Sequence, residues 1–413
     1  MAKKTIGIKP KIDDFVVIDG KYYKKYDNED GQTCLKSYPL SRIRDLFPER
    51  KDRLKIIELE GMVSVPQHYN YQQIIDGKWW NTYPPIKWVP KPGEWKMTYA
   101  FLEHIFGAQI EYGLDYLQLL LHAPEQKLPV LMLVSRERET GKSTFLYFLR
   151  ELFGRNTSLL LSDDFEDDFN DHYINSLIVA IDETSIRRTK DLERIKGLCT
   201  GKKAYEHKRY FGRREVNPIC HFVMCSNDIS AAVLIDQEET RYWVIEVPPL
   251  SYKQDNILVY LKLEMPAFLH TLLYRNLSCP YNHDERLFFS PNILQTPALK
   301  RIVNATENRK RRDEKDMAEM LLGLLDRAHI NEINMTFPDL AEAAANSPVT
   351  RHLNTQDIRA VIDQWGLATY NSSYTKYYDS GQLMRKPAIE KGRYYSFTRF
   401  LLEKVIGYET GLD

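Results

Sequence analysis

The stretch VLMLVSRERETGKST, residues 130–144, carries half of the pattern that phosphate-binding loops share. Gly141, Lys142 and Ser143 match the end of G-x-x-x-x-G-K-[ST], whereas Arg136 occupies the position of the first glycine. Such a loop binds anions because backbone N–H groups at a helix N-terminus converge on phosphate oxygens and a lysine adds a positive charge. The sequence therefore predicts a nucleotide site here, provided that a strand precedes the loop and a helix follows it.

In this interpretation Lys142 contacts the β- and γ-phosphates of ATP, and Ser143 is a ligand of Mg²⁺. The Gly141 N–H and Thr144 hold the α- and β-phosphates. The residues predicted to bind the nucleotide are Thr140, Gly141, Lys142, Ser143 and Thr144.

A pair of carboxylates, Asp182 and Glu183, closes the apolar run SLIVAIDE. A buried strand of this composition delivers the pair to the carboxyl edge of an open α/β sheet, where such sheets place their ligands. We expect Asp182 to hold Mg²⁺ through water and Glu183 to orient and deprotonate the attacking water. The plainer alternative is a strand that simply ends in acidic loop residues.

Two more apolar runs are flanked by a polar residue that suits phosphate chemistry. Asn227 follows ICHFVMCS, and its amide can donate to a phosphate oxygen and accept from water at once. An ordinary turn asparagine explains that position equally well. Arg241 precedes YWVIEV, from where it would act in trans on a neighbouring subunit's phosphates, although one arginine before a strand does not establish that role.

The segment GKKAYEHKRYFGRREV, residues 201–216, interleaves cations with aromatic side chains. The Phe211-Gly212 pair between two alternating flanks predicts a hairpin with its tip near residues 208–213. Cations and aromatic rings on a protruding hairpin suit contact with a nucleic-acid backbone, and a solvated surface hairpin is the alternative. The predicted nucleic-acid contacts are Lys203, Lys208, Arg209, Tyr210 and Arg213.

The elements around these residues have the pattern of an α/β protein. The loop lies between PVLMLV, which suits a strand buried on both faces, and STFLYFLRELFG, which suits a helix closed by Gly154. Further buried strands are predicted at TSLLL, SLIVAID, ICHFVMCS and YWVIEV. Strands that alternate with helical segments predict a parallel sheet covered by helices.

We expect five segments along the chain. Residues 1–92, with a hairpin in DFVVIDGKYYKKY, would form a small α+β accessory domain, and residues 93–126 a helical unit. Residues 127–276 would form the core, and 277–315 a linker whose charge run NRKRRDEKD is read as a linker or the start of a solvated helix. Residues 316–413 have a helix, helix, helix, hairpin order that suits a winged helix by fold analogy.

Composition narrows the class of protein. The chain has 413 residues, 43% of them hydrophobic, which is enough for two or three cores. Its 57 basic and 57 acidic residues argue against a chain that coats nucleic acid over its whole surface, but allow one concentrated basic feature.

Five scattered cysteines indicate a reducing compartment, and Cys220, His221 and Cys225 are read as strand residues rather than metal ligands. We find no apolar stretch that would span a bilayer and no signal peptide, so we expect no membrane contact.

The order of these features resembles superfamily 3 helicases of the AAA+ class. Among them it is most similar to primase-helicases of bacteriophages and mobile elements, which are related to poxvirus-type helicase-primases. The resemblance covers about residues 75–250 and includes NTYPPIKW, GLDYLQLL, KLPVLMLVS, FND and IKGLCTGKKAY. It implies an AAA+ P-loop NTPase core that uses ATP and Mg²⁺ in a ring-shaped homo-oligomer, usually a hexamer, with single-stranded DNA in a central channel. It also implies the cytoplasm of a bacterial host and a role in replication.

The resemblance assigns a role to each matching position. Lys142 and Ser143 become the nucleotide and Mg²⁺ residues, Asp182 and Glu183 the hydrolytic pair, Asn227 the sensor, Arg241 the arginine finger, and Lys208 and Arg209 the chief DNA contacts, with Lys203 assigned more loosely.

Two departures from the family's pattern bear on activity. Relatives carry Asn or Gly two residues before the second glycine of the loop, whereas this chain has Glu139. Asn and Gly tolerate positive φ, so we expect strain at Glu139 and a negative charge near the phosphates. Many relatives also carry a primase domain upstream, which about 90 residues cannot hold, so any primase or polymerase would be a separate partner.

The function implied is an ATP-dependent DNA helicase or translocase. One alternative is a replication initiator or loader that binds ATP as a switch without unwinding, which Glu139 and the short N-terminal segment would suit. Another is an ATPase that acts on protein or in phage defence, with the hairpin in contact with peptide.

Overall fold

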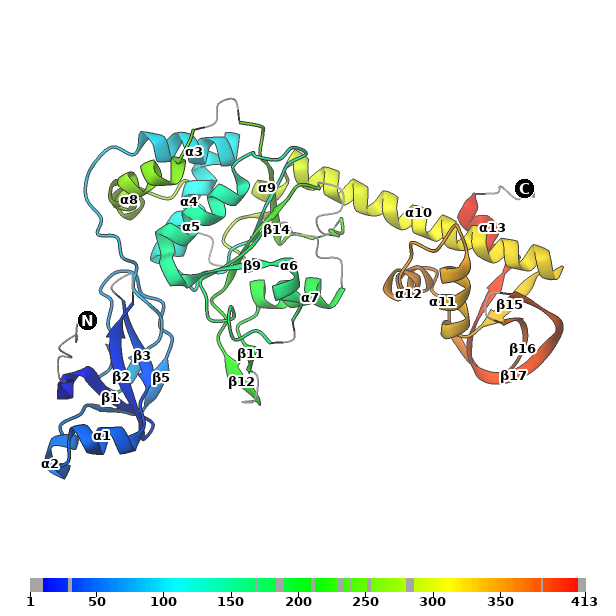
Figure 1. Cartoon of the computed structure of the whole chain (residues 1–413). Coiled ribbons are helices and arrows are strands. Elements are labelled where there is room, and N and C mark those ends of the chain that lie inside the picture. Colours follow the sequence, from blue (N-terminus) through cyan, green and yellow to red (C-terminus); the bar gives the residue numbers. More distant parts are fainter. Residues whose placement is uncertain are drawn as a thin grey trace, which may run out of the picture. The chain divides into compact units, whose positions relative to one another are not determined.

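The computed structural model describes residues 10–28, 32–167, 169–182, 189–208, 212–228, 234–237, 239–250, 254–279, 286–379 and 382–407. The chain divides into two compact units. The first is the chain up to Leu299 apart from two short segments, and the second consists of those segments and the chain from Lys300. Figure 1 shows the helices and strands of both units and labels many of them.

The first unit begins with the hairpin that the sequence predicts. Asp19 and Gly20 form its turn with φ values of 49° and 69°, and a turn with both central residues at positive φ matches the twist of the two strands. The hairpin belongs to a four-stranded sheet of order β3-β2-β1-β4, in which β4 runs parallel to β1. The elements are η1 (Ile12–Asp14), β1 (Phe15–Ile18), β2 (Lys21–Asp27), β3 (Thr33–Ser37), α1 (Leu40–Leu46), α2 (Arg50–Arg53) and β4 (Glu58–Leu59).

A second small sheet, of order β5-β7-β6, follows. The buried Asn81 amide provides hydrogen-bond partners for backbone groups of the adjacent loop. It accepts from the Val65 N–H at 3.0 Å and donates to the carbonyls of Val65 and Gln72. Trp80 is buried against β1, so it is a packing residue, whereas Trp79 is partly exposed. The strands are β5 (Gly61–Val63), β6 (Ile74–Ile75) and β7 (Trp79–Asn81).

Two helices precede the central sheet and bury the apolar faces that their sequences predict. Phe101, Leu102 and Ile105 of the first helix, and Leu117 and Leu120 of the second, lie in the main core. The elements are α3 (Lys96–Phe106), η2 (Gly107–Gln109) and α4 (Ile110–His122).

The centre of the first unit is a five-stranded parallel sheet of order β14-β8-β13-β10-β9. Its strands are the five apolar runs selected from the sequence, and Val223 of β13 lies between Leu131 of β8 and Ala180 of β10. Because all five strands run in the same direction, their carboxyl ends meet at one edge of the sheet. The strands are β8 (Val130–Val134), β9 (Thr157–Leu161), β10 (Ile178–Asp182), β13 (His221–Ser226) and β14 (Tyr242–Glu246).

Helices and a separate hairpin complete the first unit. Phe145, Phe148 and Leu149 of α5 lie fully buried in the main core, and α5 ends at Gly154, which has a φ of 59°. Cys220 and Cys225 are buried beside or within β13, as the strand interpretation requires. The elements are α5 (Lys142–Phe153), η3 (Gly154–Asn156), α6 (Ser162–Glu166), α7 (Thr189–Thr200), β11 (Ala204–Lys208), β12 (Gly212–Val216), α8 (Ile257–Tyr274) and α9 (Pro291–Leu294).

Helix α8 is, among the described residues, the one helix long and apolar enough to cross a membrane, which the sequence analysis did not find. Core helices pass the same test of length and composition, so this is weak evidence for a span. Its inner residues Leu261, Met265 and Phe268 are buried, and the helix contacts α3, α4 and α5. Its Glu264 carboxylate also accepts from the Thr98 N–H at 2.7 Å, so it caps the N-terminus of α3.

The second unit holds a three-stranded antiparallel sheet of order β15-β17-β16 packed against helices. The charge run that the sequence analysis read as a linker or a helix start lies inside one continuous helix, α10. The strand β15 was not predicted, because its four residues are too short a run to show a clear strand period. The elements are α10 (Pro297–Ala328), β15 (Glu332–Met335), α11 (Phe337–Asn346), α12 (Thr355–Gln364), β16 (Thr369–Asp379), β17 (Gln382–Thr398) and α13 (Arg399–Ile406).

Candidate functional site

The loop between β8 and α5 lies at the carboxyl edge of the parallel sheet. Gly141 is the N-cap of α5 with a φ of 91°, and the helix begins at Lys142. The N–H groups in the first turn of a helix have no partner inside the helix, and the helix dipole places positive potential there. The strand before the loop and the helix after it provide the context in which this sequence pattern binds phosphate.

Glu139 has a φ of 57°, the conformation for which the sequence analysis expected Asn or Gly. For a residue with a Cβ this conformation costs about 1 kcal/mol or more. Its side chain is exposed, so its charge lies on the solvent side of the loop. The expected strain at this position is therefore present in the backbone.

The Lys142 ammonium group is surrounded by oxygen acceptors. It donates to Ser135 Oγ, to Thr140 Oγ1 at 3.0 Å and to Asn227 Oδ1 at 2.9 Å. Burial lowers the pKa of Lys142, and the negative charge of Asp182 opposes this shift. Ser135 was not selected from the sequence, although it directly follows an apolar strand as Asn227 does.

Asp182 is the last residue of β10, and the register places it at the same edge as the phosphate loop. Its neighbour Ile181 pairs with Met224 of β13, which pairs with Met132 of β8, so one strand separates Asp182 from the loop strand. Its negative charge favours the charged form of Lys142. The other predicted carboxylate, Glu183, lies outside the described residues.

The remaining predicted nucleotide residues lie around the start of α5. Thr140 is buried, Thr144 is half-buried, and Ser143 is exposed with no hydrogen-bond partner in the described part of the chain. A free hydroxyl in the first turn of α5 is accessible to a metal ion, in keeping with the role that the sequence suggests for Ser143.

A histidine that the sequence analysis missed holds the phosphate loop from outside. His104 of α3 lies with Nε2 3.0 Å from the Thr140 carbonyl oxygen, so the Nε2–H donates to that oxygen. In a planar trans peptide the C=O and N–H point in opposite directions, so this bond turns the Gly141 N–H away from α3. The side chain of Ile105, also on α3, closes the same side of Gly141.

Arg241 lies at the opposite edge of the sheet. Its carbonyl accepts from the N–H of Val130, the first residue of β8, and its guanidinium pairs with the buried Glu239 at 3.4 Å. The length of β8, roughly 13 Å, therefore separates Arg241 from the loop of its own chain. The structure does not bring Arg241 together with Lys142 and Asp182.

The basic segment forms the predicted hairpin, which Figure 1 shows projecting from the central sheet. Asn170 anchors it, because its side chain donates to the Tyr205 carbonyl and accepts from the His207 N–H. Arg213 is exposed on β12, whereas Lys203 pairs with Glu215 at 2.6 Å. Arg209, Tyr210 and the side chain of Lys208 lie outside what the structure describes.

The fold and this site define a mixed α/β protein whose five-stranded parallel sheet is consistent with a P-loop NTPase-like core. A family model described as "Family of unknown function (DUF5906)" matches residues 133–241, from the end of β8 to Arg241. No curated protein matches the chain.

Solved structures of the NrS-1 C-terminal region have a similar fold. One aligns with a TM-score of 0.55 at 14% identity over 92% of this chain and 96% of that chain. Another, of residues 305–718 of NrS-1, aligns with a TM-score of 0.53 at 16% identity over 91% and 93%. A JCV helicase bound to a small molecule aligns with a TM-score of only 0.30 at 14% identity over 51% and 59%, too weak a likeness for inference.

Proposed function

We propose that the protein is an ATP-dependent DNA helicase or translocase of superfamily 3 type, which acts in the replication of a phage or mobile element. The observation that carries this proposal is the position of Lys142 and Asp182 at one edge of one sheet, beside the N-terminus of α5. The family resemblance in the sequence and the overall fold likeness support it.

The residues at this edge fit a nucleotide and a metal ion. Lys142 already interacts with three oxygen acceptors, which phosphate oxygens would replace, and the exposed Ser143 hydroxyl and the Asp182 carboxylate would hold Mg²⁺. When bound, Mg²⁺-ATP supplies a phosphoryl group whose transfer to water releases energy for movement. Glu183 would take the proton of that water, and Asn227 would position it.

Arg241 supports assembly into a ring, because it lies too far from the loop of its own chain to act there. An arginine at the far edge of the sheet serves a phosphate only if a neighbouring subunit supplies that phosphate. We therefore propose a closed homo-oligomer, with a hexamer as the expected size. The pair with Glu239 would hold the Arg241 side chain in place until a neighbour docks.

The basic hairpin and the second unit would contact DNA. Arg213 on the hairpin, with Lys208, Arg209 and Tyr210 near its tip, would follow a single strand in the ring's channel. The order of helices and the β16–β17 hairpin in the second unit suit a winged helix, which would add a duplex contact.

The experiment that tests the proposal measures ATP hydrolysis with and without single-stranded DNA, for the wild type and for Lys142→Ala. Hydrolysis that DNA stimulates and that Lys142→Ala abolishes supports the proposal. An ATP hydrolysis rate that single-stranded DNA does not change contradicts the proposal and favours an ATPase that acts on protein.

A second candidate function is the ATP-switched initiator or loader. The positive φ of Glu139 favours it, because a strained loop suits slow turnover. A strand-displacement assay separates the two functions: a helicase displaces the strand, whereas a switch binds ATP and DNA but displaces nothing.

A further inference from the structure

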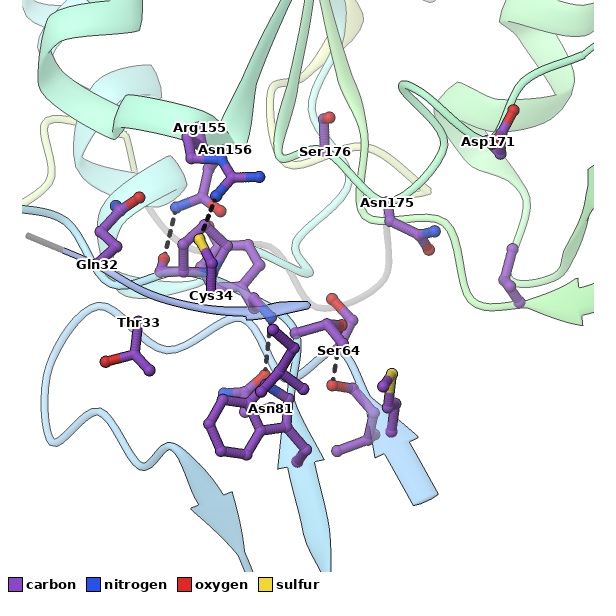
Figure 2. Close-up of a pocket in the computed structure, with 18 of the residues that line it drawn as sticks. Gln32, Thr33, Cys34, Ser64, Asn81, Arg155, Asn156, Asp171, Asn175 and Ser176 are labelled. Carbon is purple, nitrogen blue, oxygen red and sulfur yellow. Dashed lines mark hydrogen bonds between the residues drawn. The ribbon is translucent and has the colours of Figure 1, made fainter. Parts of the chain in front are cut away.

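A cleft of about 630 Å³ opens in the first unit, apart from the phosphate loop, between the N-terminal sheets and the segments that anchor the hairpin. Its size is in the range of binding sites for small molecules and cofactors. Figure 2 shows Cys34 on the N-terminal side and Arg155 on the core side, joined by a hydrogen bond of 2.8 Å from the guanidinium to the thiol. Asn156 also donates to the Pro84 carbonyl at 2.9 Å, so direct contacts fix one wall against the other.

One face of the basic hairpin forms part of the cleft. Glu206, Arg214 and Val216 line it, and Glu206 lies opposite Arg214 in the register of β11 and β12. Successive strand residues point to opposite faces, so Arg213 belongs to the other face. The hairpin therefore presents Arg213 on one face and Arg214 on the other, and Arg214 has no role in the function proposed above.

The cleft is lined by side chains of both charge signs, and Arg155 and Glu206 each have a neutral hydrogen-bond partner, the Cys34 thiol and the Asn175 amide. No ion pair joins Arg155 or Arg214 to a carboxylate within the described chain, although Asp171 and Glu206 line the same cleft. Asp171 has no hydrogen-bond partner among the described residues. A site for phosphate alone would exclude carboxylates, so the ligand must offer both anionic groups and hydrogen-bond donors.

The opposite wall supplies aromatic rings. Tyr23, Tyr26 and Tyr71 line it, but Tyr23 packs against the core beside Trp80, whereas Tyr26 is about half exposed. Rings of this kind stack on nucleic-acid bases, and base stacking is tolerant of sequence. Arginines pair with phosphate oxygens, and carboxylates accept from the amino groups that cytosine, adenine and guanine carry and thymine lacks.

We propose that this cleft binds a short stretch of single-stranded nucleic acid next to the hairpin and prefers bases with an exocyclic amino group. The inference rests on the proposed function, because it extends the DNA path from the hairpin to the N-terminal sheets. Tyr26 and Tyr71 stack on the bases, Arg155 and Arg214 contact phosphates, and Asp171 accepts from a base amino group.

The test measures the binding of fluorescein-labelled oligodeoxycytidine and oligothymidine of equal length to the full chain by anisotropy. Tyr26→Ala is expected to weaken binding about fivefold or more, the effect of one lost stacking contact. Arg214→Gln is expected to reduce the slope of log affinity against log salt by about 0.7, the effect of one phosphate contact on a single strand. Asp171→Asn is expected to remove the preference for deoxycytidine. Arg42→Gln, an exposed change on α1, is the matched control and leaves all three quantities unchanged.

A second measurement does not depend on variants. Photocrosslinking of the wild type to an oligonucleotide with iodinated cytosines is expected to label Tyr26 or Tyr71. Labelling confined to the hairpin, or cleft variants that bind as the wild type does, would overturn the inference and point to another occupant such as a peptide. The proposed function stands in that case if Arg213→Gln still weakens binding, and it fails if the wild type binds no DNA.

Discussion

Asn227 Oδ1 accepts a hydrogen bond from Lys142 Nζ at 2.9 Å, which joins the residue after β13 to the first residue of α5. The lysine is thus held by a side chain that follows another strand of the sheet. A phosphate oxygen that approaches Lys142 competes with Asn227, and the released amide is then free to bind water or phosphate.

Asn227→Ala separates binding from turnover. We expect kcat for ATP hydrolysis to fall about a hundredfold, the usual effect of removing one positioned polar group from a site. ATP affinity should change little, because the Asn227 amide no longer competes with a phosphate oxygen for Lys142. Single-turnover kinetics and fluorescent-nucleotide binding measure the two quantities. Ser226→Ala, in the same turn, is the control and keeps both values near those of the wild type. A parallel loss of affinity and kcat would show that Asn227 only supports the loop.

Glu139→Gly should improve the phosphate loop. Glycine at either position adds freedom to the unfolded chain, but only at residue 139 does it remove the cost of a φ of 57°, so we expect the free energy of unfolding of Glu139→Gly to exceed that of Arg138→Gly by about 1 kcal/mol and ATP binding to tighten. Thermal unfolding and nucleotide titration measure these effects. Arg138→Gly is the matched control, because Arg138 does not have positive φ and glycine there only adds freedom to the unfolded chain. Equal behaviour of the two variants would rule out strain at Glu139 as the limit on activity.

His104→Ala should loosen the loop without unfolding the protein. The Thr140 carbonyl loses its donor, so the Gly141 N–H is no longer fixed toward the phosphate site, and we expect ATP affinity to fall about two- to tenfold. His122→Ala is the control, because His122 Nε2 lies 3.2 Å from the Leu272 carbonyl, away from the loop. A loss of melting temperature common to both variants, with affinity unchanged, would mean that His104 is only structural.

The stability of the first unit should depend on pH through His68. Burial lowers the pKa of His68 to about 4 from 6.5. Between these two values the unfolded chain binds more protons than the folded chain, so stability is full above about pH 6.5 and is lost as the pH falls toward 4. The shift corresponds to about 3 kcal/mol. Melting temperatures measured across this range should fall less steeply for His68→Gln than for the wild type. His172→Gln, at an exposed site, should keep the wild-type slope.

The central sheet was predictable because its strands have few alternatives. Runs such as VLMLV and IVAID are apolar at nearly every position, and a strand buried on both faces of a parallel sheet is where such short runs fit. The turn at Asp19-Gly20 and the end of α5 at Gly154 were also predictable from a short local pattern, because each depends on a residue suited to positive φ.

Contacts between distant segments were not predictable from local patterns. His104 lies on α3, and no spacing in the sequence links it to Thr140. Ser135 could have been found, because the rule that selected Asn227, a polar residue directly after a buried strand, also selects it. Of the two readings of the charge run, a linker or the start of a helix, the structure agrees with a helix, although the run lies in its interior: charges of opposite sign such as Arg309 and Asp313 stand four residues apart and support a continuous α10.

Arg241 gives the sharpest test of a shared site, because the strand β8 separates it from the loop of its own chain. If Arg241 acts on a neighbour's ATP, Arg241→Ala subunits should inhibit the wild-type subunits in mixed oligomers. The ATPase rate should then fall more steeply than the fraction of wild-type chains. The measurement is the ATPase rate across a series of mixing ratios at constant total protein. Glu246→Ala, at the other end of β14, is the control for effects on the strand itself and should give no such inhibition. A strictly proportional decline for Arg241→Ala would mean that each subunit works alone and that the arginine acts within its own chain or not at all.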